Sequence, residues 1–143
     1  MATINATVSI GSDIMSSPTN ISKTMTMKKA GTTTGLNLTT GLSSKRYTAT
    51  TQVVLQAYND VAVTSGGANK VYIRNTGSDK AQYFIITLAD TTDAVEDVGR
   101  LYGGDWMLIP YNGNTNITVA SDGGIEQTLE YMVFADGIVT AAG

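Results

Sequence analysis

Alternation of apolar and polar residues with a period of two recurs along the second half of this chain. Six runs rich in β-branched and aromatic residues predict strands over 50–57, 70–74, 82–88, 105–111, 116–120 and 127–134. The run 82–88 is apolar on both faces, which predicts a central strand, whereas Pro110 predicts an edge position or the close of its strand. The segment 92–100 is the one that most resembles a helix, but it lacks an apolar stripe with helical spacing.

Turn-forming residues separate these runs at short intervals. Glycine, asparagine, serine and aspartate gather at 65–67, 75–79, 102–105, 112–114 and 121–124. Glycine and asparagine supply the positive φ that tight hairpins need. Short strands with frequent turns predict an all-β body over 48–143, a β-sandwich or jelly-roll-like domain and not a βαβ sheet.

The first 46 residues contain no aromatic residue, and the remaining 97 contain all ten. Such a segment has too few large apolar groups to offset the entropy of ordering it as a separate domain. We therefore expect residues 1–47 to form an extended N-terminal arm. Crude alternation over 3–10 and 21–27 allows strands that add to the body or to a partner. The alternative is a tail that never becomes ordered.

Charge is divided unevenly along the chain. Residues 1–50 carry five basic side chains and one acid, whereas residues 51–143 carry four basic and eleven acidic side chains. A basic arm on an acidic body predicts contact with an acidic surface, either on a partner or on the body of its own or a neighbouring subunit. The basic charges are too sparse to predict nucleic-acid binding, and no aromatic precedes Tyr47 to stack on a base.

The composition excludes several kinds of chemistry. The chain has no cysteine and no histidine, so disulfides, Cys–His and Ser–His–Asp catalysis and the commonest zinc ligand are absent. We therefore expect that the protein is not an enzyme and that it binds no cofactor and no metal ion. The acidic loop from Asp90 to Asp97 offers oxygen ligands for Ca²⁺, but its spacing differs from an EF-hand and favours a solvated loop.

No signal peptide and no membrane-spanning run are recognisable in the 143 residues, so we expect one domain made in the cytoplasm, with no membrane partner.

Three aromatic residues near one another in the sequence are candidates for an interface anchor or a sugar platform, namely Tyr102, Trp106 and Tyr111. Alternation places Trp106, Leu108 and Pro110 on one face of their strand and Met107, Ile109 and Tyr111 on the other. We expect Trp106 to lie in the core and Tyr111, beside an Asn-Gly turn, to be exposed.

The central block resembles small β-rich virion proteins of tailed bacteriophages. The resemblance rests on KVYIRNTGS (70–78), QYFIITLAD (82–90), GRLYGGDWMLIPYNG (99–113), ITVAS (117–121) and LEYMVF (129–134), and covers about half of the chain. An I-x-N-T-G turn, a G-R-L-x-G-[DE]-W hairpin and a closing E-Y-M-x-F strand carry it. It implies a jelly-roll-like capsid cement or decoration protein, or a related head or tail component, with no catalytic signature.

We therefore expect a structural protein of the virion capsid, a homo-oligomer (trimer or dimer) that binds the major capsid protein or another virion protein. The expected contacts in the arm are apolar at Ile21, Met25 and Met27, and basic at Lys28, Lys29, Lys45 and Arg46. The alternative is a tail or fibre module that recognises host glycans through Tyr102, Trp106 or Tyr111.

Overall fold

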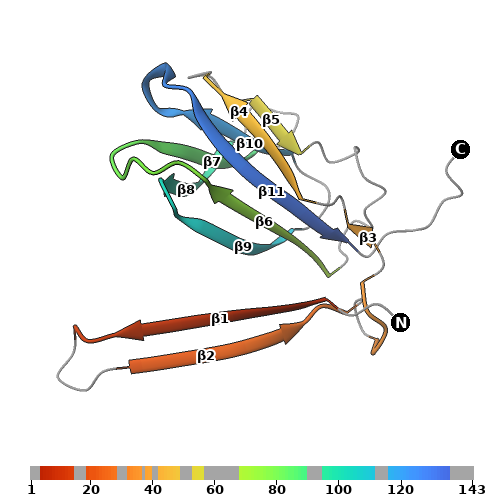
Figure 1. The fold of residues 1–143 in the computed structure, drawn as a ribbon. Helices are drawn as coiled ribbons and strands as arrows, with labels where there is room; N and C mark the ends of the chain where they lie inside the picture. The colour runs from red at the N-terminus through yellow and green to blue at the C-terminus, as the bar shows by residue number, and fades with distance from the viewer. Residues whose placement is uncertain are drawn as a thin grey trace, which may run out of the picture.

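The computed structural model describes residues 4–14, 19–28, 32–36, 38–39, 42–48, 53–56, 68–89, 95–111 and 116–135. Within these ranges the chain forms eleven strands and one short 3₁₀ turn, which confirms the expected all-β fold. Two sheets face each other in a sandwich, and a two-stranded hairpin stands apart from them (Figure 1).

The elements divide into two sheets, a hairpin and a turn. One sheet contains β3 (Leu38–Thr39), β4 (Ser43–Tyr47), β11 (Gln127–Ala135), β6 (Asn69–Asn75) and β9 (Trp106–Tyr111). The other contains β5 (Val53–Gln56), β10 (Asn116–Ser121), β7 (Tyr83–Ala89) and β8 (Val95–Tyr102). The hairpin is β1 (Asn5–Ser12) with β2 (Thr19–Thr26), and the 3₁₀ turn η1 (Asp122–Gly124) links β10 to β11.

The strands from β4 to β11 pair as nested antiparallel hairpins. β4 pairs with β11, β5 with β10, β6 with β9, and β7 with β8. Pairing of β11 with β6 and of β10 with β7 joins these hairpins into two sheets. Nested pairing of this kind makes the connectivity jelly-roll-like. β7 lies inside its sheet and β9 lies at an edge, as their sequences predict.

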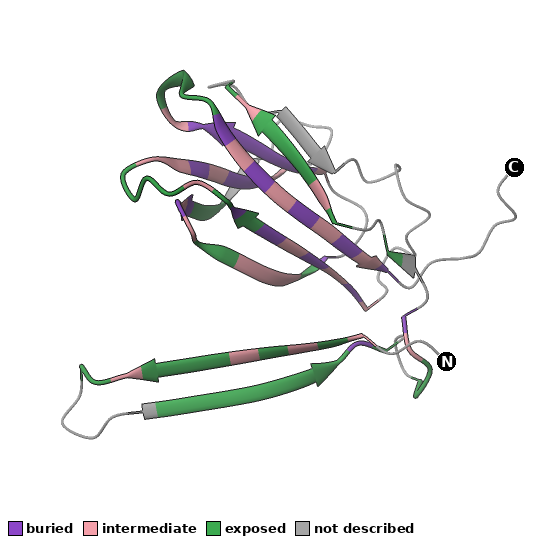
Figure 2. Cartoon of the chain, viewed as in Figure 1, coloured by how far each residue is buried: buried purple, intermediate pink, exposed green. Residues whose placement is uncertain are grey.

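The core lies between the two sheets and follows the period-two alternation of the strands. β11 alternates buried and half-buried residues along its whole length, which is visible as the banding in Figure 2. The buried apolar residues come from both sheets: Val71, Ile73, Phe84, Ile86, Leu101, Tyr111, Ile117, Val119, Leu129, Tyr131, Val133 and Ala135. The rings of Tyr47 and Phe84 pack edge to face at 6.2 Å, which brings β4 onto this core.

Two features of the fold differ from the simplest interpretation of the sequence. The segment 92–100, which most resembles a helix in sequence, contains most of strand β8. This strand is held by backbone pairing to β7, and its residues Val98, Gly99 and Arg100 are exposed. In addition, β4 lies within the segment expected to be an arm but pairs with β11 in the body. The part of the arm that leaves the sandwich is the β1–β2 hairpin.

A buried pair of side-chain amides joins the two sheets at one end of the sandwich. Asn75 Nδ2 donates to the Leu101 carbonyl at 2.9 Å and to Gln127 Oε1 at 3.3 Å. Gln127 Nε2 donates to the Tyr83 carbonyl and to Ser121 Oγ, each at 2.9 Å. The two amides thus connect β6 and β11 of one sheet to β7, β8 and β10 of the other.

The β8–β9 turn packs backbone to backbone against the loop after β6. The amide of Gly104 donates to the Asn75 carbonyl at 2.9 Å, and Lys80 Nζ donates to the Gly103 carbonyl at 2.7 Å. A Cβ on Gly103 would lie 2.5 Å from the Asp79 carbonyl oxygen, a distance that real Cβ atoms do not show. Gly103 is therefore required by close approach of the backbone.

We predict that Gly103→Ala destabilises the protein by about 1–3 kcal/mol, because the added methyl group forces two backbone segments apart. Chemical denaturation followed by circular dichroism measures this loss. The matched control is Gly123→Ala, where φ is +59° but no atom lies within 4 Å of the added Cβ. A smaller loss for Gly103→Ala than for Gly123→Ala would contradict the close-approach argument.

We also predict that Asn75→Ala and Gln127→Ala each lower the free energy of unfolding by about 1–3 kcal/mol, because each removes buried hydrogen bonds that join the two sheets. The double variant should lose less than the sum of the single losses, with a coupling of about 0.5–3 kcal/mol. Gln82→Ala is the control, since that side chain makes no hydrogen bond with the described residues. Strict additivity would show that the two amides act independently.

Candidate functional site

The β1–β2 hairpin has one apolar face and one polar face. Strand pairing places Ala6 opposite Met25, Val8 opposite Lys23, and Ile10 opposite Ile21, and residues directly opposite each other share a face. The other face carries only asparagine, serine, threonine and glycine: Asn5, Thr7, Ser9, Gly11, Asn20, Ser22, Thr24 and Thr26. The hairpin is therefore amphipathic.

Side-chain hydrogen bonds reinforce the polar face of the hairpin. The hydroxyls of Thr7 and Thr24 lie 2.9 Å apart, and Thr26 Oγ1 donates to Asn5 Oδ1 at 2.9 Å. These contacts link the two strands without any apolar core beneath them. The apolar face is thus left available for contact.

The apolar face of the hairpin is exposed along its distal half. Ile10 is 53% exposed, Ile21 42%, and Ile14 at the tip 91%. Met25, which pairs with Ala6 near the base, is 38% exposed. Most of the hairpin is accordingly drawn as exposed in Figure 2. Adjacent exposed aliphatic side chains on a projecting element mark a surface that gains free energy when it is covered.

The proximal half of the same face lies against the sandwich. Ala6 and Val8 are half-buried, and together with Tyr72, Leu108 and Phe134 they line a cleft of about 280 Å³ between the hairpin and the outer face of the β6–β9–β11 sheet. The base of the hairpin is fixed, because the Met27 amide donates to the Ile4 carbonyl at 2.8 Å.

The three apolar residues of the arm that were expected to contact a partner differ in their exposure. Ile21 and Met25 lie on the exposed apolar face. Met27 is only 2% exposed at the base of the hairpin, so its expected contact with a partner is wrong. Its burial follows from the backbone, since the Leu36 amide donates to the Met27 carbonyl at 3.2 Å and Leu36 is itself 2% exposed.

The basic residues of the arm do not form one cluster with the hairpin. Lys28 is exposed beside an isolated bridge to Gly35, and Lys29 lies outside the described residues. Lys45 lies in β4 with its ammonium 5.5 Å from the centre of the Tyr131 ring. Arg46, also in β4, pairs with Glu126 at 3.3 Å. β4 thus uses two of the expected partner-binding charges within the chain.

The structure separates the three aromatic candidates. Trp106 lies on the outer face of the β6–β9–β11 sheet and is 49% exposed, so the expectation of a core tryptophan is wrong. Tyr111 is 3% exposed in the core, so the expectation of an exposed tyrosine is also wrong. The alternation was correct, but the face that carries Met107, Ile109 and Tyr111 is the inner one. Tyr102 packs on Tyr83 at 5.1 Å in the other sheet.

Polar groups surround the exposed tryptophan. Arg74 lies directly opposite both Trp106 and Glu130, so these three side chains form a row across the sheet. Tyr72 Oη donates to Glu130 Oε1 at 2.8 Å, and Arg74 Nη1 lies 3.7 Å from the same oxygen. Burial, and then the hydrogen bond to Glu130, raise the pKa of Tyr72, so the phenol remains protonated at neutral pH.

A shallow depression in the protein surface lies beside this row of side chains. Tyr72, Arg74, Gly104 and Trp106 line an open depression of about 470 Å³. It adjoins the cleft beneath the hairpin, because Tyr72 and Trp106 line both. We call the four residues Tyr72, Arg74, Trp106 and Glu130 the tryptophan surface.

Sequence reasoning missed Tyr72, Arg74 and Glu130 as candidates. The signal was present, because residues alternate within β6: Val71 and Ile73 point to the core, which places Tyr72 and Arg74 on the opposite face. The same alternation in β11 places Glu130 outward between buried Leu129 and Tyr131.

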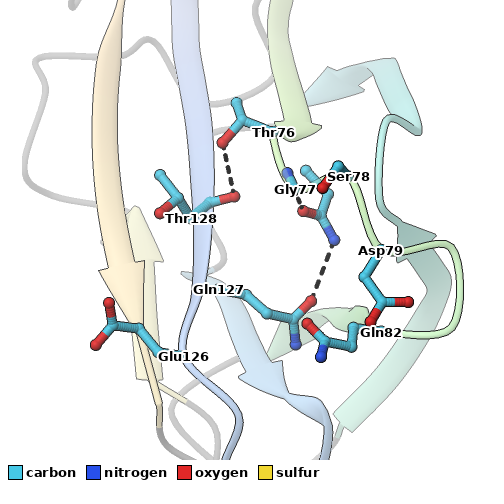
Figure 3. A pocket seen from close by; sticks show the side chains of 9 residues that line it. Thr76, Gly77, Ser78, Asp79, Gln82, Glu126, Gln127 and Thr128 are labelled. Atoms are coloured by element: carbon cyan, nitrogen blue, oxygen red, sulfur yellow. Dashed lines mark hydrogen bonds between the residues drawn. The ribbon is translucent and has the colours of Figure 1, made fainter.

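A polar hollow of about 250 Å³ lies at the end of the sandwich, outside the buried amides (Figure 3). Several of its polar groups already bond within the chain: Thr76 Oγ1 donates to the Thr128 carbonyl at 3.1 Å, Asp79 Oδ1 accepts from the Ala81 amide at 2.8 Å, and Glu126 accepts from Arg46. These groups therefore hold the end of the sandwich together, and we do not treat the hollow as a ligand site.

Within the described ranges, no three carboxylate side chains gather where a metal ion would bind. The possible calcium loop from Asp90 to Asp97 lies largely outside those ranges, and of its side chains nothing is described. None of the described segments forms a helix with the length and apolar character needed to cross a bilayer.

Comparisons with known proteins found one distant structural likeness. No family model matches the chain, and no curated protein matches it. Among solved structures, a crystal structure of the Yersinia pseudotuberculosis-derived mitogen is similar, with a TM-score of 0.42 and 6% identity over 71% of this chain and 90% of that chain. A likeness this distant carries no argument about function.

Proposed function

We propose that this chain is a structural virion protein that cements or decorates a phage head shell, with the hairpin as its attachment element. The observation that carries the proposal is the amphipathic β1–β2 hairpin, which stands off a jelly-roll-like body with Ile10 and Ile21 exposed. The resemblance of 70–134 to small virion proteins supports the same role.

The physical argument concerns what the hairpin gains on binding. Its exposed aliphatic side chains each contribute about 1.5–3 kcal/mol when fully buried. Among the strands that the structure describes, β1 and β2 pair only with each other, so their outer edges have backbone groups that a strand of a neighbouring protein can pair with. Lys23 on the apolar face and Lys28 at the base favour an acidic partner surface.

The first test is the number of copies in purified virions of the encoding phage, measured by quantitative mass spectrometry against the major shell protein. We expect a copy number comparable to that of the shell protein, because decoration follows the symmetry of the shell. A few copies per particle would favour a tail or fibre module, and absence from the particle would overturn the proposal.

We predict that the double substitution Ile10→Ser and Ile21→Ser weakens attachment to shells assembled from the major shell protein by about tenfold or more, because the buried apolar area falls. Co-sedimentation of shells with the full chain measures the affinity. Point substitutions are preferred to deletion through residue 46, which would also remove β4 from the body sheet.

The matched control is Ser9→Ala with Ser22→Ala, a directly opposite pair on the polar face of the same hairpin. This variant should bind shells like the wild type. Raising the salt concentration should weaken attachment if Lys23 and Lys28 meet an acidic surface. Equal loss in both double variants would indicate that the apolar face is not the attachment surface.

A further inference from the structure

The single tryptophan of the chain lies on the solvent side of a sheet. Its strand neighbours Met107 and Ile109 turn inward to the core, so the outward position of Trp106 follows from the strand register. Among the residues that the structure describes, no aromatic ring or cation stacks on the indole. A large aromatic group left open in this way gains free energy when a ligand covers it.

The groups beside the indole are polar and held in position. Arg74 and Glu130 extend from the two adjacent strands in the same cross-strand row. The Glu130 carboxylate is fixed by the Tyr72 hydroxyl at 2.8 Å, whereas Arg74 approaches it only to 3.7 Å and keeps guanidinium donors for another acceptor. Gly104 borders the depression and has no side chain to fill it.

We propose that the tryptophan surface binds a saccharide. A sugar ring has an apolar face of C–H groups and a rim of hydroxyls, so it matches an indole face that is bordered by hydrogen-bonding groups. In this arrangement Trp106 stacks on the ring, Arg74 donates to a hydroxyl or carboxylate oxygen at the rim, and Glu130 accepts from a hydroxyl. Tyr72 acts as a positioning residue, since its hydroxyl holds Glu130.

Two features favour a saccharide over a second copy of the chain. The Glu130 carboxylate lies in the same row as the indole, whereas protein interfaces are depleted in glutamate. The depression is also open and shallow, with room for a ligand of a few sugar rings. The inference does not depend on attachment to a shell, because the exposed hairpin residues lie outside this surface.

The test uses the full chain on an array of oligosaccharides, followed by titration with the strongest binder. Because Trp106 is the only tryptophan, its fluorescence reports this surface alone. We expect saturable binding with a shift of the emission to shorter wavelength. Trp106→Ala and Arg74→Ala should each weaken binding by about tenfold or more on the array.

Tyr102→Ala is the control, since it removes a half-buried aromatic residue from the other sheet and should bind like the wild type. Arg74→Ala retains the tryptophan, so fluorescence and circular dichroism establish that this variant is folded. The Ile10→Ser, Ile21→Ser variant should also bind the oligosaccharide normally, which separates this test from that of shell attachment.

Three results would overturn the inference. One is the absence of any binder on the array, and another is unchanged binding by Trp106→Ala. The third is an emission shift that depends on protein concentration without added saccharide, which would mean that a second copy of the chain covers Trp106.

Discussion

Hydrogen bonds from a buried pair of side-chain amides, Asn75 and Gln127, join the two sheets of this fold. The two amides also bond to each other. One amide belongs to β6 and the other to β11, and between them they satisfy carbonyl oxygens of β7 and β8. Hydrophobic packing alone is tolerant of sliding, whereas buried hydrogen bonds fix distance and direction. Within the β6–β9–β11 sheet, strand pairing places Arg74 beside Glu130 and Trp106 on the outer face, where Tyr72 bonds to Glu130.

The sequence predicted the position of a strand well where that strand is rich in β-branched and aromatic residues. Runs rich in β-branched and aromatic residues located β6, β7, β9, β10 and β11 to within a few residues, and Pro110 correctly indicated an edge strand. The sequence did not locate β8, whose exposed Val98, Gly99 and Arg100 carry no apolar pattern. It also paired the right residues in β9 but chose the wrong face, because Trp106 and Tyr111 are both large aromatics and alternation alone does not say which side meets the core.

The candidate sites were less predictable, because they depend on contacts between distant segments. Ile21 and Met25 were expected as contact residues, but the amphipathic character of the hairpin appears only once β1 is paired with β2. Met27 and Leu36 are buried at the hairpin base through backbone contacts that no local pattern reveals. The charges of Lys45 and Arg46 similarly find partners on β11 and beyond it, through strand pairing across some eighty residues of chain.

Nested strand pairing has a consequence for how this molecule is made. β11 lies between β4 and β6 in its sheet, yet of the strands that the structure describes it is the last to leave the ribosome. Until then β4 lacks its partner and β6 is paired on one side only, with β9, so the apolar sides of this sheet remain open to other chains. Folding that depends on such distant pairings is slow, and a chain released before β11 is made has one sheet without the strand that joins β4 to β6.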